Sequence, residues 1–438
     1  MRRSSALAVG LAALLTFGIS SSMSSAWADT LVGKPCTKVG ATTGDGPGRT
    51  VVCTKVTKGK DKGKLVWRLM KTPNPGPTPG PTPGPTPGPG PTPGPECTKR
   101  PTFSHDVIAL DHVQVVVPIG QQTGFGGVLS VRSYIHSKPE LHGQKLPLYA
   151  PTDMTLTAAA YYLPPNAPPG YQAEYSLFFD AGCGIEVQLY HVKGVSGSVA
   201  SVVPKEPVPS SAGQPVTPTQ VKAGEQLGWY QGEAGRSVAF DFRVQDARHR
   251  NTFINQQRFD SSPGASGELT AICPYDLYVG SQRERWLAKL GAPSGDPVPG
   301  TTCGTISQGK AGTALGMWFF ADAKVNTLTY RGQTWTAGWA AGQYQSQVLF
   351  TLDPSKAVRI GGLNPSAPMD QLIVGKSGPG NTTWKDPAAV IAGQEHCWSN
   401  ESRAVKVRLS ADGASLTAVV GQGGCSGLDL SKGVTYVR

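Results

Sequence analysis

The sequence predicts a mainly β protein built from several units. Beyond residue 97, strand candidates are plentiful, helical periodicity is scarce, and turn-forming residues separate the strands at short intervals. Such a pattern is typical of sheets, sandwiches and barrels. Strands are expected over 113–117, 175–179, 185–190, 238–244, 325–330, 404–409 and 415–419, and one helix over 281–290.

Residues 1–28 are typical of a secretory signal peptide. The basic pair Arg2-Arg3 precedes a short apolar stretch, and the segment ends on a small-x-small sequence at Ala28. The apolar stretch is too short to span a bilayer and no second long one follows, so no transmembrane anchor is expected. We therefore expect a secreted protein, extracellular or associated with the cell wall.

Eight cysteines in an exported chain predict disulfide bonds, because the compartment outside the cytoplasm is oxidising. Cys36 and Cys53 are expected to pair because a long linker isolates them from the others. Cys397 and Cys425 are expected to pair because they are neighbours in sequence. The other four, Cys97, Cys183, Cys273 and Cys303, allow three pairings that the sequence does not separate.

Residues 29–72 form a small basic module with a Cys/Trp pattern. Alternating apolar residues around Cys53 and Trp67 predict two short strands in a hairpin, held by the disulfide because so short a segment builds little core. The module carries ten Lys and Arg against three Asp. Its lysines Lys58, Lys60, Lys62 and Lys64 either bind an anionic cell-wall polymer or form a solvated hairpin tip.

Residues 73–96 consist of Pro-Gly-Pro-Thr repeats. Proline fixes φ and removes backbone donors, so this linker is expected to be an extended polyproline-II spacer. At about 3.1 Å per residue it reaches roughly 70 Å, which suits a tether between a surface-attaching module and a working domain.

The domain predicted over 97–297 contains four segments in a fixed order: Leu148-Tyr-Ala-Pro, Leu189-Tyr-His-Val, Val221-Lys-Ala-Gly-Glu-Gln-Leu-Gly and Ala239-Phe-Asp-Phe-Arg-Val. Together they resemble the β framework, a duplicated hybrid motif, of the lysostaphin-type (LytM-like) zinc peptidases that cut peptidoglycan cross-bridges. The resemblance covers about 105–246 and implies a LytM-like sheet domain. Gly224 and Gly228 suit turns that need positive φ or a close backbone approach.

The resemblance implies a zinc ion held by two histidines and an aspartate, with an open position for water. Where that family carries its last His-x-His pair, this chain has Phe240 and Phe242 on either side of an aspartate. Upstream, only His136 and Glu140 match the spacing of the family's first two ligands. Phenylalanine offers no lone pair to a metal, so the expectation is a degenerate site without a cofactor.

A rearranged zinc site is the alternative. Its metal ligands would be His136, Asp153 and Asp241, with His191 as the candidate catalytic residue, if the sheet brings them together. Each of these residues is also an ordinary hydrogen-bonding residue of a surface or core. Nucleotide and serine-hydrolase chemistry is not expected, because the sequence contains neither a P-loop nor a Gly-x-Ser-x-Gly elbow.

The domain predicted over 298–438 is β-rich and Gly-rich, a sandwich or barrel-like unit that follows a boundary in 291–300. It contains five tryptophans: Trp318, Trp335, Trp339, Trp384 and Trp398. Exposed indole rings suit stacking on sugars, whereas buried ones fill a core, which is the commoner role of large aromatics.

Three functions are compatible with these patterns. The expected one is a secreted, non-catalytic cell-envelope or extracellular binding protein on a degenerate peptidase-like scaffold. The alternatives are a secreted zinc peptidase acting on peptidoglycan and a carbohydrate-binding protein that uses the C-terminal aromatics. The expected partner is an anionic cell-wall polymer or a polysaccharide; specific nucleic-acid binding is not expected.

Overall fold

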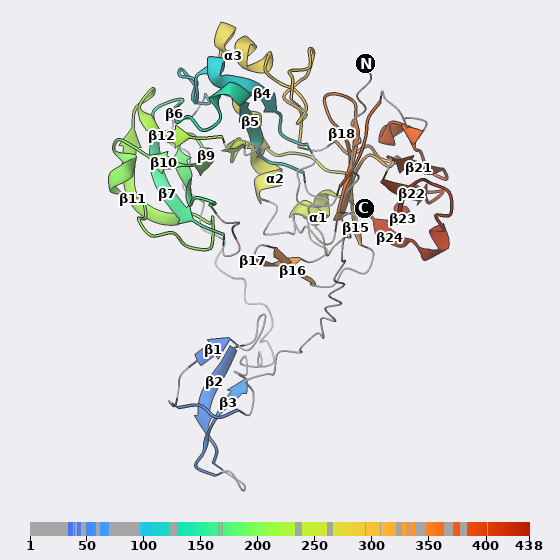
Figure 1. Cartoon of the computed structure of the whole chain (residues 1–438), viewed down its shortest axis with the longest axis horizontal. Coiled ribbons are helices and arrows are strands. Elements are labelled where there is room, and N and C mark those ends of the chain that lie inside the picture. Colours follow the sequence, from blue (N-terminus) through green and yellow to red (C-terminus); the bar gives the residue numbers. More distant parts are fainter. Residues whose placement is uncertain are drawn as a thin grey trace, which may run out of the picture. The chain divides into compact units, whose positions relative to one another are not determined.

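Strands dominate the part of the chain that the structure, a computed structural model, describes (Figure 1). It describes residues 34–37, 39, 42–44, 50–57, 62–69, 97, 99–121, 129–164, 167, 170–232, 239–260, 266–293, 295–306, 308–320, 326–330, 333–337, 347–362, 371–376, 383–400 and 402–438. The expected signal peptide and proline-rich linker lie outside these residues. The predicted mainly β class is confirmed.

The chain divides into two compact units, Met1–Pro91 and Thr92–Arg438. The first contains the antiparallel strands β1 (Thr42–Gly44), β2 (Thr50–Lys55) and β3 (Leu65–Leu69), in the order β1-β2-β3. Cys53 lies opposite Trp67 in the β2–β3 ladder and is fully buried. It forms the expected disulfide with Cys36. The module therefore has one strand more than the predicted hairpin.

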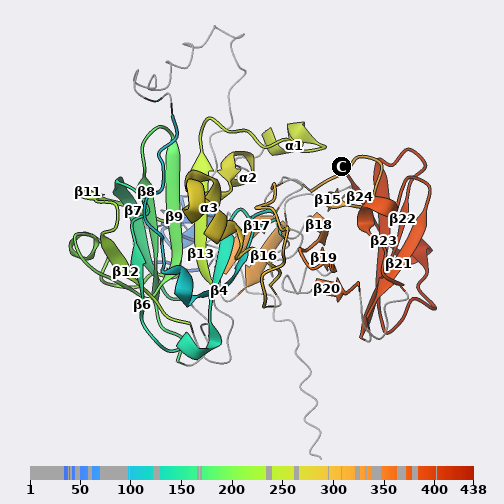
Figure 2. The same cartoon turned by 90° about the horizontal axis from the view of Figure 1, so that it is seen from above.

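The second unit begins with an antiparallel sheet in the order β11-β7-β8-β9-β13-β5-β4, with β14 paired to β13. Its strands are β4 (Val113–Val117), β5 (Ser133–Ser137), β7 (Met154–Tyr162), β8 (Glu174–Asp180), β9 (Ile185–Val192), β11 (Gln214–Val221), β13 (Phe240–Asp246) and β14 (Ala271–Ile272). The strands β7, β8, β9 and β13 run side by side at its centre (Figure 2). We call it the central sheet.

The central sheet has one apolar and one polar face, because side chains alternate along a strand. On β13, Phe240, Phe242 and Val244 enter the hydrophobic core, together with Val187 and Leu189 of β9. The residues between them face the other way. The polar face therefore carries the charged residues of β8, β9 and β13, and it is the face on which we find the candidate site.

A second, small sheet contains two of the four motif segments. Its strands are β6 (Leu146–Tyr149), β10 (Gly194–Val195) and β12 (Gln226–Tyr230), in the order β10-β12-β6. Gly224 has φ +81°, and a Cβ on Gly228 would stand 2.0 Å from the carbonyl oxygen of Gly194. Both glycines thus meet the backbone requirements predicted for them.

The α-helices are short and follow β13 in the chain: α1 (Gln256–Asp260), α2 (Ser266–Thr270) and α3 (Gly280–Leu287). Short 3-10 helices lie at Leu110–His112, Pro139–Leu141, Val199–Ser201, Pro274–Leu277, Pro387–Ala389 and Leu430–Lys432. α3 is the helix predicted over 281–290. Its buried Trp286 stacks on Tyr275 and Tyr278 and donates from Nε1 to Asp106 at 2.8 Å. None of the helices among the described residues is long and apolar enough to cross a membrane.

The C-terminal sheet is antiparallel, barrel-like and nearly closed, in the order β20-β19-β18-β15-β24-β23-β22-β21. Its strands are β15 (Gly316–Phe320), β18 (Gln347–Leu352), β19 (Val358–Gly361), β20 (Gln371–Val374), β21 (Glu395–Ser399), β22 (Arg403–Leu409), β23 (Ser415–Gln422) and β24 (Val434–Val437). A separate hairpin joins β16 (Asn326–Tyr330) to β17 (Gln333–Ala337). Asn400, beside β21, donates to the carbonyl of Ile373 on β20 at 3.4 Å and so links the two edge strands.

The described disulfides settle the open pairings. Cys97 pairs with Cys183 and Cys273 with Cys303, while Cys397 pairs with Cys425 as expected. The core of the central sheet continues past residue 297 to Ile306 and Leu349. The boundary at 297/298 stays a prediction.

Candidate functional site

The structure brings two of the four residues of the rearranged site together. His191 near the end of β9 and Asp241 on β13 lie with Nε2 and Oδ2 3.5 Å apart. His136, on the neighbouring strand β5, lies within the electrostatic reach of Asp241. Burial lowers the pKa of His136 below its ordinary value, although the charge of Asp241 acts in the opposite direction. His136 is therefore a neutral neighbour of the pair.

Asp153 does not join this group. It lies in the turn before β7, where its carboxylate accepts the backbone N–H of Ala223 and forms an ion pair with Lys222, both at 2.9 Å. The hydrogen bond from Ala223 and the charge of Lys222 lower the pKa of Asp153. With its side chain 62% exposed, Asp153 braces a surface turn and contacts none of the other three candidates.

The main partner of His191 is a residue that the sequence patterns did not single out. Nδ1 of His191 lies 2.6 Å from Oε1 of Glu174, the first residue of β8. The backbone of His191 has φ +63°, a left-handed conformation that costs a non-glycine residue about 1 kcal/mol or more. The other ring nitrogen, Nε2, faces Asp241, so one imidazole reaches a carboxylate with each ring nitrogen.

Glu174 is fully buried and surrounded by donors. Its Oε1 accepts the hydroxyls of Tyr162 and Tyr171, and its Oε2 accepts Nζ of Lys193 at 2.8 Å. Burial alone raises the pKa of Glu174, but the positive charges of His191 and Lys193 lower it far below its ordinary value. Glu174 is therefore an ionised, hydrogen-bonded carboxylate inside the protein.

Asp241 is held by a second cation. Nη1 of Arg132 donates to its Oδ2 at 3.0 Å, and the guanidinium carbon lies 3.7 Å from the centre of the Tyr190 ring. Burial alone raises the pKa of Asp241, but His191 and Arg132 lower it below its ordinary value. Its other oxygen, Oδ1, is buried and accepts no hydrogen bond within the described part of the chain.

These five residues, Arg132, Glu174, His191, Lys193 and Asp241, form what we call the charge cluster. Two carboxylates alternate with three cations across the polar face of the central sheet. Burial lowers the pKa of His191, but the negative charges of Glu174 and Asp241 outweigh burial and raise it to about 10. The imidazole is therefore a cation at neutral pH.

The charge cluster does not fit zinc. A catalytic zinc takes about three protein ligands with free lone pairs. Both nitrogens of the imidazolium carry protons toward carboxylates, and the guanidinium of Arg132 donates to Oδ2 of Asp241, the same oxygen that faces His191. No group of three His, Cys, Asp or Glu side chains with metal-binding geometry occurs among the described residues.

The phenylalanines at the expected histidine positions explain part of this misfit. Phe240 and Phe242 are fully buried and face the apolar core, where Phe242 packs near Phe103 and Tyr275. Asp241, between them, is the residue that reaches the polar face. Ligands at 240 and 242 would therefore lie on the opposite side of the sheet from His191.

The remaining candidates are surface and core residues. Lys62 and Lys64 are exposed at the turn before β3, whereas Lys58 and Lys60 lie outside the described residues. Of the tryptophans, Trp318 and Trp398 are fully buried in the barrel-like core, as in the core interpretation.

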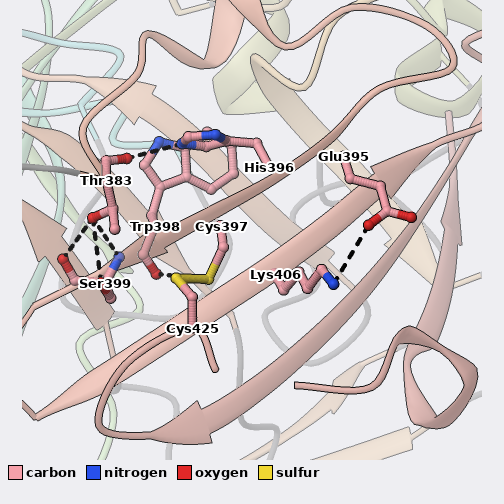
Figure 3. Close-up of a disulfide and its surroundings, with 8 residues drawn as sticks. All are labelled: Thr383, Glu395, His396, Cys397, Trp398, Ser399, Lys406 and Cys425. Carbon is pink, nitrogen blue, oxygen red and sulfur yellow. Dashed lines mark hydrogen bonds and ion pairs between the residues drawn. A yellow bond between two sulfur atoms is a disulfide. The ribbon is translucent and has the colours of Figure 1, made fainter. Parts of the chain in front are cut away.

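Figure 3 shows Trp398 edge-on to His396, beside the Cys397–Cys425 disulfide. Trp384 is half-buried and donates its N–H to the carbonyl of Lys356 at 2.9 Å. The side chains of Trp335 and Trp339 are outside the described part. The three described indoles thus serve packing and backbone hydrogen bonds.

A weak sequence signal pointed to the missed members of the charge cluster. Glu174 begins a strand in which four of the seven residues are aromatic or apolar, and Lys193 follows His191 by two residues. Charged residues at strand ends are common, so only their pairing in space distinguishes them. A comparison with protein-family models found no matching family, and a comparison with curated proteins found no significant match.

Proposed function

We propose that this chain is a secreted, non-catalytic binding protein of the cell envelope or extracellular space, built on a degenerate peptidase-like sheet. The observation that carries the proposal is the imidazolium of His191, held between Glu174 and Asp241. A general base needs an unprotonated nitrogen, and a metal ligand needs a lone pair. With a pKa raised to about 10, His191 offers neither at neutral pH.

The charge cluster resembles the ion-pair networks that stabilise folds. A cation fixed between two buried carboxylates replaces the charge that a metal ion would bring, and it needs no metal. The LytM-like framework then serves as a scaffold, and the basic N-terminal module and its proline-rich linker serve attachment and reach. Four disulfides among the described residues suit an oxidising extracellular setting.

Metal analysis tests the non-catalytic half of this proposal. The full-length protein is incubated with equimolar zinc, dialysed and analysed by mass spectrometry beside His191→Ala. We expect neither protein to retain stoichiometric zinc. About one zinc per wild-type chain, lost in His191→Ala, would establish the alternative of a rearranged peptidase site.

Co-sedimentation with purified cell walls tests the binding half. The full-length protein is expected to sediment with the walls, and a fragment that begins at Cys97 is expected to do so more weakly. An absence of sedimentation by the full-length protein over a range of ionic strengths contradicts a cell-envelope role. Release of peptidoglycan fragments during the incubation contradicts the non-catalytic assignment.

A further inference from the structure

A cleft of about 590 Å³ lies beside β14 of the central sheet, and none of the residues of the charge cluster lines it. One wall is the segment 249–254, and the other is formed by Gly304, Thr305 and Gly309. Isoleucine and phenylalanine side chains, Ile119, Ile272 and Phe253, contribute apolar lining. The volume lies within the range of small-molecule sites, and the mixture of apolar lining and a few charged groups is typical of them.

The walls of the cleft are held in place. Asn251 donates from Nδ2 to the carbonyls of Glu268 and Ala271, both at 2.8 Å, and its Oδ1 accepts from Nε2 of His249 at 3.0 Å. The opposite wall follows the Cys273–Cys303 disulfide, and Gln308 donates to the carbonyl of Gly120 at 2.7 Å. A cleft fixed in this way needs little ordering when a ligand enters.

Two arginines at the rim retain free donors. Arg100 uses Nε on the buried carboxylate of Asp246 at 2.6 Å, and Arg250 uses Nη2 on Asp260 at 2.5 Å. The other guanidinium nitrogens of both arginines have no partner among the described residues. Both side chains are well exposed, at 45% and 59%. They offer forked N–H pairs to a ligand, a geometry that matches carboxylates.

Positive charge exceeds negative charge around the rim. Asp246 also accepts Arg248, so one carboxylate serves two guanidinium groups. The carboxylate that lines the cleft, Asp276, is neutralised by Arg283 at 2.6 Å. The cleft thus favours an anion.

We propose that this cleft binds a carboxylated sugar of one or two rings. The carboxylate lies at Arg100 and Arg250, and the apolar face of the ring lies on Phe253, which is itself stacked on Phe259 with ring centres 3.6 Å apart. The ligand class rests on the proposed extracellular binding function, since acidic polysaccharides are available there. The cleft is the place in the fold where that function would be exerted.

Calorimetric titration of the full-length protein tests the assignment, with digalacturonic acid as the probe and its uncharged counterpart, galactobiose, as the control ligand. We expect saturable binding of the acid and about tenfold or weaker binding of the neutral disaccharide. Arg250→Gln should weaken binding of the acid about tenfold or more, because it removes a charged donor. Arg408→Gln, which removes a similarly exposed arginine paired with Glu395, should leave it unchanged.

Asp276→Asn is expected to increase binding, a result that a misfolded variant would not give. Removing this carboxylate from the cleft should strengthen binding of digalacturonic acid several-fold and leave galactobiose unaffected. The assignment is overturned if the wild type shows no saturable binding of the acid, or if Arg250→Gln and Asp276→Asn both bind it like the wild type.

The cell-wall sedimentation separates the two proposals. Sedimentation without binding of the disaccharide overturns the cleft and leaves the proposed function standing. Arg250-dependent binding of the disaccharide without sedimentation supports the cleft and overturns the cell-envelope role.

Discussion

At the scale of single residues, His191 combines two costs that its partners offset. Its left-handed backbone is strained, and its charge is largely withdrawn from water. Ion pairs with Glu174 and Asp241 compensate for the lost hydration. Breaking a buried pair from one side costs more than the pair contributes, because the remaining charge stays buried. Glu174, which serves four donors, is the member whose loss should matter most.

We expect Glu174→Gln to destabilise the protein by about 3–5 kcal/mol, since it leaves Lys193, whose side chain is 3% exposed, without its counter-charge. Urea unfolding followed by tryptophan fluorescence measures the change. Glu206→Gln, the same substitution at an exposed position, should stay within about 0.5 kcal/mol of the wild type. Equal stability of the two variants contradicts a structural role for the charge cluster.

The raised pKa of His191 predicts a pH dependence of stability. Histidine has an ordinary pKa of 6.5, and the folded protein holds His191 at about 10. The protonated form is thus favoured by folding, so its stabilisation is fully present below pH 6.5 and is lost as the pH rises through about 10. Unfolding free energies of wild type and His191→Gln at pH 6, 8 and 10 should converge as pH rises. A gap that stays constant over this range shows that His191 does not titrate there.

The sequence led to two of the five residues of this cluster. The motif positions identified His191 and Asp241, because the resemblance supplied their strands. Glu174, Lys193 and Arg132 were missed. A bulge in the β8–β9 ladder lies next to Glu174, Lys193 follows the end of β9, and Arg132 lies in the segment before β5. The candidate Asp153 lies apart from the group, because Lys222 and the N–H of Ala223 hold it in a surface turn, which nothing in its own segment indicates.

At the scale of elements, the small sheet depends on a close backbone approach between β10 and β12. We expect Gly228→Ala to destabilise the protein by about 1–3 kcal/mol, because its Cβ would lie 2.0 Å from the carbonyl oxygen of Gly194. Gly424→Ala, at an open position without positive φ, should be nearly neutral. Thermal unfolding of both variants measures the difference, and an unchanged Gly228→Ala melting temperature contradicts the close approach.

Periodicity predicted the long elements well. Each of the seven expected strands overlaps a strand of the structure, and the expected helix overlaps α3. Two-residue strands such as β10 and β14 have no period to detect, and the order of strands within a sheet is set by contacts between distant residues. The C-terminal sheet could therefore be predicted as a sandwich or barrel-like unit, but its strand order, which runs from β20 to β21, could not.

At the scale of the whole molecule, the net charge is distributed unevenly along the chain. Of the net charge of +11, residues 29–72 supply +7 and Arg2-Arg3 supply two more, which leaves +2 for residues 73–438. The unit Thr92–Arg438 is therefore nearly neutral as a whole, and its positive charge is local, as at the rim of the cleft. The basic module has the charge density for long-range attraction to polyanions.

This asymmetry predicts where salt sensitivity resides. On a heparin column, the full-length protein should elute at a clearly higher salt concentration than a fragment beginning at Cys97, because the fragment lacks most of the net charge. Lys62→Gln with Lys64→Gln in the full-length chain should elute between them, since both lysines are exposed and their attraction is screened within about 10 Å at 0.1 M salt. Co-elution of the full-length protein and the fragment would place the polyanion contact in the second unit, where the arginines of the cleft are the candidates. The two proposals thus predict different results. Removing the basic module lowers the salt concentration at which the protein elutes from heparin, whereas substituting Arg250 removes one contact to a bound saccharide.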